Sequence, residues 1–536
     1  MSEPLQPALW WRTGVIYQIY PRSFQDSKPA PLANGIGDLR GIEQRLPYLA
    51  SLGVAAIWIS PFYPSPMADF GYDVADYTGV DPLFGTLADF DSLLAAAHAA
   101  GLRVILDFVP NHTSNQHPWF LASRSSRTDP KRDWYLWRDP SPAGGPPNNW
   151  QSQFGGSAWT FDEATQQYYC HSFLPQQPDL NWRNPEVRTA MYGAMRFWLD
   201  KGVDGFRMDV LWLLIKDGQF RDNPPNPDWH PGESTSWSVL PRYTADQPET
   251  HEIVGEMRAL LNSYQERVLI GEIYLPLQEL VAYYGPAGKG ADMPFNFHLI
   301  LTEWNADRIA QLIRTYESLL PTGAWPNWVL GNHDQSRLAS RLGSAQARVA
   351  AVLLLTLRGT PTMYYGDELG LPNAIIAPDQ VQDPAEIRQP GIGQGRDPER
   401  SPMPWDDSAQ FGFTHASNTW LPFADPSGQL TVQHEDADPT SFLTLYRRLL
   451  KLRREHPVLH SGDIRNVASS NGVLTFDRAL SGLPGRQIRV LLNLTNSAQT
   501  IPATPGQLLL TSFLDDGVPT TILRPSEAVL FALPQP

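Results

Sequence analysis

Apolar and polar positions along the chain repeat one compound pattern three times. In residues 42–60, 90–108 and 187–210, apolar residues first recur at helical spacing and then give way to a continuous apolar run of strand length. The glycines that separate the two parts are Gly53, Gly101 and Gly202. This order predicts an amphipathic helix, a glycine that ends it, and a β-strand buried on both faces. Such strands alternating with helices are typical of a parallel sheet covered by helices.

Four further apolar runs predict additional strands: VIYQIY (15–20), RVLIGEIY (267–274), NWVLGN (327–332) and TPTMYYG (360–366). This number of strand–helix units fits an α/β fold of the (β/α)8 type, a TIM barrel, better than a doubly wound sheet. No glycine-rich phosphate-binding loop follows the first strand, and GIGQG (391–395) follows no strand at all. A nucleotide site is therefore not predicted.

The barrel pattern is interrupted and then followed by segments of a different character. Residues 112–182 are rich in Trp, Pro, Asn and Gly, which predicts a domain inserted after the third strand. Residues 214–250 and 370–425 are expected to be long loops after the fourth and eighth strands. From residue 463 onward, short alternating runs predict an antiparallel β-sandwich. We therefore expect a barrel from residues 1–111 and 183–462, an inserted domain at 112–182, and a C-terminal β-sandwich at 463–536.

Composition narrows the classes of partner. The 536 residues carry a formal net charge of −15 and contain no long basic run, so a nucleic-acid surface is not expected. The single cysteine, Cys170, excludes an intrachain disulfide. The longest apolar run (349–357) is shorter than the roughly 20 residues of a membrane helix, and the N-terminus lacks a signal-peptide pattern. We expect a cytoplasmic protein that does not bind membranes, and no pattern indicates its oligomeric state.

Charged and imidazole side chains follow several of the predicted strands. In a barrel of this type the C-terminal ends of the strands meet at one rim, where active sites lie. The residues expected at that rim are Asp107, His112, Arg207, Asp209, Glu272, His333 and Asp334. Asp107 has two open interpretations, a structural role that fixes its loop and a direct contact with a ligand.

Seven sequence motifs together carry a family resemblance: GVIYQIYPRSF, DFVPNH, QPDLNW, GFRMDV, GEIY, GNHDQSR and GRDPERSPMPW. In this order they resemble the conserved regions of the α-amylase superfamily, glycoside hydrolase family 13, and within it the α-glucosidase and oligo-1,6-glucosidase branch. The resemblance runs from about residue 10 to the C-terminus. It implies the same barrel, an inserted domain after the third strand, and a C-terminal β-sandwich.

The resemblance also implies the chemistry of the rim. Asp209 corresponds to the nucleophile, Glu272 to the general acid/base, and Asp334 to the carboxylate that holds sugar hydroxyls in the transition state. In retaining glycosidases the first two groups act as a pair about 5–5.5 Å apart. Arg207 stands two residues before Asp209, so strand alternation places both on the inner face, where a cation keeps Asp209 ionised.

By the same resemblance, further residues bind the sugar. His112 and His333 correspond to hydrogen-bond donors, and Tyr72 to an aromatic platform. Asp69 and Arg400 correspond to the pair that binds the non-reducing end of the glucose and closes the pocket. Phe173 is open between a pocket aromatic and a core residue of the inserted domain.

Two features depart from the family pattern or bear on linkage. Many relatives bind Ca²⁺ in the loop after the first strand, but here KPAPLA interrupts residues 25–39 and only Asp26 and Asp38 remain. Since Ca²⁺ takes about six to eight oxygen ligands, we name no metal ligands and expect no required cofactor. Val210 follows the predicted nucleophile; in relatives, valine here accompanies a preference for α-1,6 linkages.

The sequence therefore predicts a retaining exo-α-glucosidase that acts on small oligosaccharides or glucosides of the maltose, isomaltose or sucrose type. One alternative is a transglucosidase or sucrose isomerase that uses the same covalent intermediate. A second alternative is a non-catalytic interaction subunit with a similar barrel. Because such subunits lack catalytic residues, the complete Asp209, Glu272 and Asp334 set favours an enzyme.

Overall fold

A parallel eight-stranded sheet forms the centre of the protein. The structure, a computed structural model, describes residues 9–480, 487–503, 506–515, 517 and 521–534. The strands follow the order β10-β11-β1-β2-β3-β7-β8-β9. Their bounds are β1 Ile16–Ile19, β2 Ala56–Ile59, β3 Arg103–Phe108, β7 Gly205–Met208, β8 Val268–Gly271, β9 Met293–Pro294, β10 Asn327–Val329 and β11 Thr360–Tyr364. This is the expected (β/α)8 barrel.

The seam between β9 and β10 is closed by a side chain rather than by a strand ladder. The side-chain Nδ2 of Asn327 donates to the Pro294 carbonyl, and its Oδ1 accepts from the backbone amide of Asn296 at 2.8 Å. The sequence prediction did not locate β9, because this strand has only two residues. One buried asparagine thus completes the ring.

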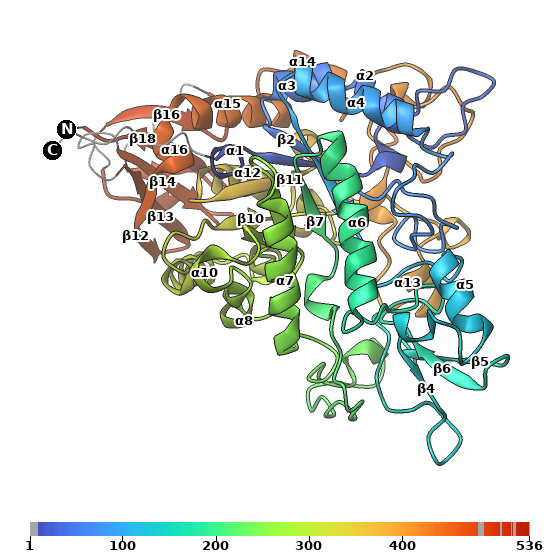
Figure 1. The fold of residues 1–536 in the computed structure, drawn as a ribbon. Coiled ribbons are helices and arrows are strands. Elements are labelled where there is room, and N and C mark those ends of the chain that lie inside the picture. Colours follow the sequence, from blue (N-terminus) through green and yellow to red (C-terminus); the bar gives the residue numbers. More distant parts are fainter. Residues whose placement is uncertain (1–8, 481–486, 504–505, 516, 518–520, 535–536) are drawn as a thin grey trace.

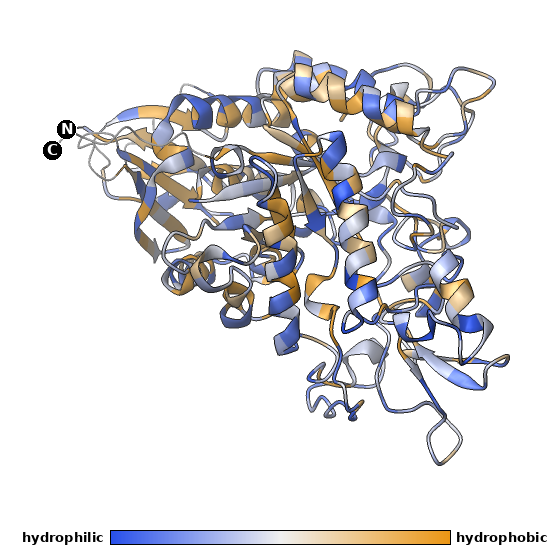
Figure 2. Ribbon diagram, viewed as in Figure 1, coloured by the Kyte–Doolittle hydropathy of each residue, from blue (hydrophilic) through white to orange (hydrophobic). Residues whose placement is uncertain are grey.

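Strand alternation divides the barrel core into two layers. Side chains such as Ile16, Trp58 and Ile270 share one buried cluster inside the barrel, whereas Tyr17 and Ile57 belong to the cluster that packs against the helices. This is the period of two that a closed sheet requires. Figure 2 shows the apolar colouring concentrated on the central strands, with mixed colouring on the surrounding helices.

Helices cover the outside of the barrel, as Figure 1 shows. The main ones are α2 Leu39–Gln44, α3 Leu46–Leu52, α4 Leu87–Ala99, α6 Pro185–Lys201, α7 Pro248–Leu261, α8 Leu277–Ala282, α10 Ala306–Leu319, α12 Ser344–Thr356 and α15 Phe442–Glu455. Gly53 and Gly202 end α3 and α6 with φ of 95° and 105°, the left-handed conformation expected of them. The helix predicted over 42–52 is divided at Arg45, since Pro47 in the next turn has no amide hydrogen.

The insertion follows β3 and lies at the opposite end of the molecule from the C-terminal sheet (Figure 1). It contains α5 Pro118–Ser125 and a three-stranded antiparallel sheet of order β4-β6-β5. The strands are β4 Trp137–Arg138, β5 Trp159–Asp162 and β6 Gln167–Cys170. The buried ion pair of Lys216 and Asp179, at 2.8 Å, ties the insertion to the loop after β7.

The C-terminal part contains five antiparallel strands in the order β12-β13-β14-β18-β16. Their bounds are β12 Asp463–Ser470, β13 Val473–Ala479, β14 Gln487–Asn493, β16 Gln507–Thr511 and β18 Ala528–Ala532. One face packs on α10 and α12, and the other packs on the short pair β15 Gln499–Thr500 and β17 Ile522–Leu523. The expected sandwich is therefore unequal, because barrel helices cover one face of its main sheet.

Within the part of the chain that the structure describes, no helix combines the length and apolar character needed to cross a membrane.

Candidate active site

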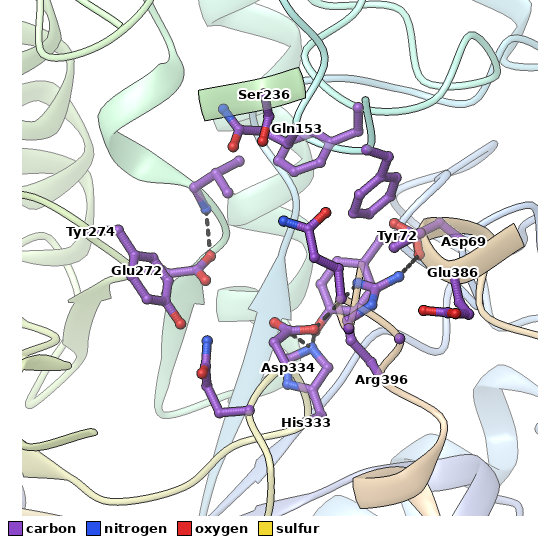
Figure 3. A pocket seen from close by; sticks show the side chains of 18 of the residues that line it. Asp69, Tyr72, Gln153, Ser236, Glu272, Tyr274, His333, Asp334, Glu386 and Arg396 are labelled. Atoms are coloured by element: carbon purple, nitrogen blue, oxygen red, sulfur yellow. Dashed lines mark hydrogen bonds and ion pairs between the residues drawn. The ribbon is translucent and has the colours of Figure 1, made fainter. Parts of the chain in front are cut away.

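A cavity of about 1020 Å³ opens at the C-terminal ends of the barrel strands. Figure 3 shows side chains of its lining, among them Glu272, His333 and Asp334, converging from different parts of the chain. Eight of the ten predicted site residues line it: Asp69, Tyr72, His112, Phe173, Asp209, Glu272, His333 and Asp334. The other two, Arg207 and Arg400, are fully buried and contact the carboxylates of the cavity from behind. The cavity and the side chains behind it thus bring together residues that are far apart in the sequence, such as Asp69 and Arg400, which are separated by 331 positions.

Arg207 lies at the centre of three carboxylates. Its Nη1 donates to Asp107 Oδ1 and Asp209 Oδ1, each at 2.7 Å, and its Nη2 lies 2.7 Å from Glu272 Oε2. Met208, between Arg207 and Asp209, packs outside the barrel, as strand alternation predicts. One guanidinium therefore fixes the predicted nucleophile and the predicted acid/base.

The electrostatics of this group favour retention of a proton. Burial raises the pKa of Asp209 and of Glu272, while the positive charge of Arg207 opposes the rise. Full ionisation of both groups and of Asp107 would leave two negative charges that Arg207 does not compensate. The pair formed by Asp209 and Glu272 therefore holds one proton more readily than an exposed pair would.

Asp107 has the structural role that was one of its two interpretations. It is 1% exposed and does not line the described cavity. Besides Arg207, it accepts hydrogen bonds from Trp58 Nε1 at 3.1 Å and Tyr72 Oη at 3.0 Å. Burial raises the pKa of Asp107 to about 6, against the effect of Arg207. It holds the groups that face the cavity.

Asp334 lies in the opposite electrostatic environment. Arg400 Nη2 and Arg396 Nη1 lie 2.8 and 3.3 Å from Asp334 Oδ1. Burial alone would raise the pKa of Asp334, but the neighbouring His333 and these guanidinium groups lower it below its ordinary value. Asp334 is therefore ionised throughout the neutral range.

The predicted pairing of Asp69 with Arg400 is wrong. Asp69 Oδ1 accepts a hydrogen bond from Arg396 Nη2 at 2.8 Å (Figure 3). Arg400 instead donates its Nε to the His333 carbonyl and its Nη2 to Asp334. The short 3₁₀ turn Pro398–Arg400 carries Arg400 beneath the cavity, whereas Arg396 enters from the cavity loop. Both arginines belong to the same motif, so spacing alone did not distinguish them.

Sequence reasoning missed the carboxylate that holds Arg396. Asp383 is fully buried, and its Oδ1 lies 2.6 Å from Arg396 Nη2. Its Oδ2 accepts from the backbone amide and the Nε of Arg396 at 2.6 and 3.0 Å. No motif marks Asp383. A second missed residue is Gln177, whose Nε2 donates to Asp69 Oδ2 at 3.1 Å.

The aromatic and imidazole groups form the cavity floor. The rings of Tyr72 and His333 stack with centroids 5.3 Å apart, and Tyr72 Oη lies 2.6 Å from His333 Nε2. His112 Nε2 lies 3.2 Å from the Gln177 side chain. Phe173 combines both of its interpretations, since it lines the cavity and packs with Phe154 in a small apolar cluster.

Val210 adopts a backbone conformation that is rare for a β-branched residue. Its φ is 37° and its side chain is 8% exposed. Its amide donates to Glu272 Oε2 at 2.8 Å. Strained backbone conformations cluster at functional sites. Here the strained residue directly follows Asp209, and its conformation directs the Val210 amide toward Glu272.

The site and the fold agree with the result of comparison with known proteins. The family model described as the catalytic domain of alpha amylase matches residues 18–462. The chain belongs to the α-amylase family. Its activity is of the glycoside hydrolase, α-glucosidase type, because similar proteins are named alpha-glucosidase and oligo-1,6-glucosidase.

Three similar α-amylase family proteins illustrate the range of relatives. A probable alpha-glucosidase of Rhizobium meliloti is 42% identical, over 92% of this chain and 90% of its own. The crystal structure of the alpha-glucosyl transfer enzyme XgtA matches with a TM-score of 0.91 and 40% identity, over 98% of this chain and 99% of its own. The human amino acid transporter heavy chain SLC3A1 is 39% identical, over 95% of this chain and 75% of its own.

The loop that binds Ca²⁺ in many members of the α-amylase family contains its own cation. Lys28 Nζ lies 3.0 Å from Asp38 Oδ2 and 3.6 Å from Asp26 Oδ1. Asp26 Oδ2 is already used, since it accepts the backbone amides of Asn34 and Gly35. Among the described residues, no group of three or more His, Cys, Asp or Glu side chains is arranged to hold a metal. These residues do not fit a hard cation.

Proposed function

We propose that this chain is a retaining, exo-acting α-glucosidase that releases α-glucose from the non-reducing ends of short α-glucosides. The observation that carries the proposal is the placement of Asp209 and Glu272 on one buried guanidinium, in a cavity closed at one end by Asp69 and Arg396. A carboxylate pair supplies both roles that a retaining glycosidase needs. A closed end admits a chain terminus and excludes a chain interior.

In the first step, an oxygen of Asp209 forms a bond to the anomeric carbon while the bond from that carbon to the leaving oxygen breaks. Glu272 transfers its proton to the leaving oxygen. In the second step, Glu272 takes a proton from water, whose oxygen attacks the anomeric carbon and releases Asp209. Two inversions give α-glucose. Acid–base chemistry of the two carboxylates supplies each step, so the scheme includes no cofactor.

The transition state places positive charge on the sugar ring, and ionised Asp334 is situated to stabilise it. Arg207 contacts both carboxylates, and we propose that Asp209 is the ionised member of the pair and Glu272 the protonated one, as a retaining mechanism requires. We propose that His112, His333, Tyr72 and Arg400 orient the glucose or the groups that hold it, because they converge on the same cavity or on Asp334.

The test is Asp209→Asn together with product analysis. We expect Asp209→Asn to lower maltose hydrolysis at least 10³-fold while the circular dichroism spectrum and the melting temperature stay near those of the wild type. A matched control is Asp217→Asn, since Asp217 follows the same strand but pairs with Arg221 outside the described cavity. Wild-type activity in Asp209→Asn, β-glucose as the first product by proton NMR, or rapid cleavage inside long chains would each contradict the proposal.

A transglucosidase or sucrose isomerase is the second candidate, and the structural similarity to the alpha-glucosyl transfer enzyme favours it. The intermediate would be the same, and a sugar or alcohol hydroxyl would replace water. Chromatography of products from concentrated maltose and sucrose separates the two candidates. Free monosaccharides as the only products would exclude transfer; isomerised or longer sugars as the main products would establish it.

The non-catalytic alternative is less consistent with the site. The human transporter heavy chain shows that similar chains occur in transport proteins. In this chain, however, Asp209, Glu272 and Asp334 all line one cavity, and buried cations contact each of them. Function follows from the site rather than from the fold.

A further inference from the structure

The wall of the cavity contributed by the loop after β7 differs from the rest of the lining. No charged residue of the described cavity lining falls within residues 210–250, although Asp209 directly precedes this segment. Within the segment, only Asn226 and Ser236 are polar, and the remaining lining residues are apolar. Figure 3 shows Ser236 and Gln153 across the cavity from His333 and Asp334. This wall therefore lies on the opposite side of the cavity from His333 and Asp334.

Two side chains of this wall are large, apolar and exposed. Trp237 is 54% exposed and Leu240 is 43% exposed, and both line the cavity. The described Trp237 ring has no aromatic partner and belongs to none of the buried apolar clusters. An exposed apolar patch at the mouth of a cavity is typical of a ligand groove, because covering it with a ligand removes apolar surface from water.

The turn that presents Trp237 is held firmly by three other segments. The Gly156 amide of the insertion donates to Thr235 Oγ1 at 2.8 Å, and Gln389 Oε1 accepts from the Thr235 amide at 3.1 Å. Asn226 Nδ2 donates to the Trp237 carbonyl at 2.8 Å. The backbone that carries this exposed ring is thus fixed in place at the cavity mouth. Such preorganisation lowers the entropic cost of binding.

The inner part of the same wall contains an unpartnered donor. Trp212 lines the cavity, is 9% exposed, and its Nε1 has no hydrogen-bond partner among the described residues. Buried polar atoms normally find partners, so this donor is an exception that the described residues do not explain.

We propose that Trp237, Leu240 and Trp212 form an aglycone site that favours glucosides and acceptor alcohols carrying an aromatic ring. The inference rests on the proposed glucosidase function and names its preferred aglycone. A sugar aglycone presents several hydroxyl groups, and the loop offers only Asn226 and Ser236 to meet them. An aromatic group instead covers the exposed Trp237 and Leu240.

The test compares benzyl α-glucoside with methyl α-glucoside, whose leaving groups have similar basicity. For the wild type we expect the ratio of kcat/KM, benzyl over methyl, to be about tenfold or more. Trp237→Ala is expected to lower this ratio roughly threefold to tenfold, and Trp237→Phe to restore most of it. The matched control is Trp229→Ala, since Trp229 lies in the same loop but outside the described lining, and we expect its ratio to match the wild type.

The outcomes distinguish this inference from the proposed function. A wild type that is inactive on both glucosides contradicts the glucosidase itself. An active enzyme whose benzyl-to-methyl ratio is unchanged by Trp237→Ala, or falls equally in Trp229→Ala, overturns the aglycone site. A loss in Trp237→Ala that is as large for isomaltose as for benzyl α-glucoside assigns the ring to a sugar and overturns the aromatic preference.

Discussion

Asp383→Asn is expected to weaken substrate binding although Asp383 does not touch the substrate. Asp383 is fully buried and lies outside the described cavity lining, and it contacts Arg396 through four hydrogen bonds. Arg396 in turn bonds Asp69 and lies 3.3 Å from Asp334. Arg396 therefore reaches the substrate end of the cavity only in the orientation that Asp383 fixes. We regard Asp383 as a positioning residue.

The magnitude follows from these contacts. Asparagine retains one acceptor oxygen but removes the charge and at least one charged hydrogen bond, each of which contributes about 1.5–3 kcal/mol. Arg396 keeps two other carboxylate partners, so the loss stays below the roughly 3–5 kcal/mol of a fully broken buried pair. About 2 kcal/mol corresponds to a roughly thirty-fold fall in kcat/KM for maltose. Because the proposed role of Arg396 is to hold bound glucose, we expect KM to rise more than kcat falls.

The assay is a double-mutant cycle measured by kcat/KM. Asp383→Asn and Arg396→Lys are expected to be coupled by about 1 kcal/mol or more. Asp425→Asn is the control, because this partly exposed carboxylate in the same long loop bonds only its own turn. Additive effects with Arg396, or an unchanged KM in Asp383→Asn, would refute the positioning role.

Three further predictions concern stability. The ammonium group of Lys28 occupies the position between Asp26 and Asp38, so Lys28→Met should lower the free energy of unfolding by about 1 kcal/mol. For the same reason EDTA should leave the wild-type melting temperature unchanged. A fall in that temperature with EDTA would contradict this prediction. Burial raises the pKa of Glu399 to about 8, so at neutral pH the folded protein binds a proton that the unfolded chain has released. The stability that this proton contributes is present at low pH and is lost as the pH rises through 8. Glu399→Gln should therefore make the melting temperature less dependent on pH between pH 5 and 8. Lys216→Met leaves Asp179 buried without its cation and should destabilise the protein by about 3–5 kcal/mol in urea unfolding, with Asp179→Asn in the same background restoring part of the loss.

Most of the barrel was predictable because local pattern and tertiary environment agree. The apolar runs at 15–20, 267–274 and 360–366 each contain a buried strand. Where the element is too short or too polar, the pattern fails. β9 has two residues, and β12 has only Ile464 and Val467 as large apolar residues among exposed and half-buried positions, so neither was predicted as a separate strand.

The site was predictable as far as strand ends determine it. Asp209 and Glu272 follow β7 and β8 directly, so the barrel geometry brings them together. Loop contacts are different, because a long loop has no period that fixes which side chain points where. Arg396 and Arg400 are four residues apart, and only the path of the loop determines which of them reaches Asp69.

The two ends of the cavity are built by different means, and this has a kinetic consequence. The closed end is a network of ion pairs from separate segments, in which Arg396 meets Asp69, Asp334 and Asp383. In the proposed function it contacts the glucose unit, which every substrate shares, so changes there should alter kcat/KM for all glucosides by a similar factor. The wall with Trp237 would contact only the group that varies between substrates. Changes there should alter the ratio between glucosides, and this difference assigns any new variant to one end or the other.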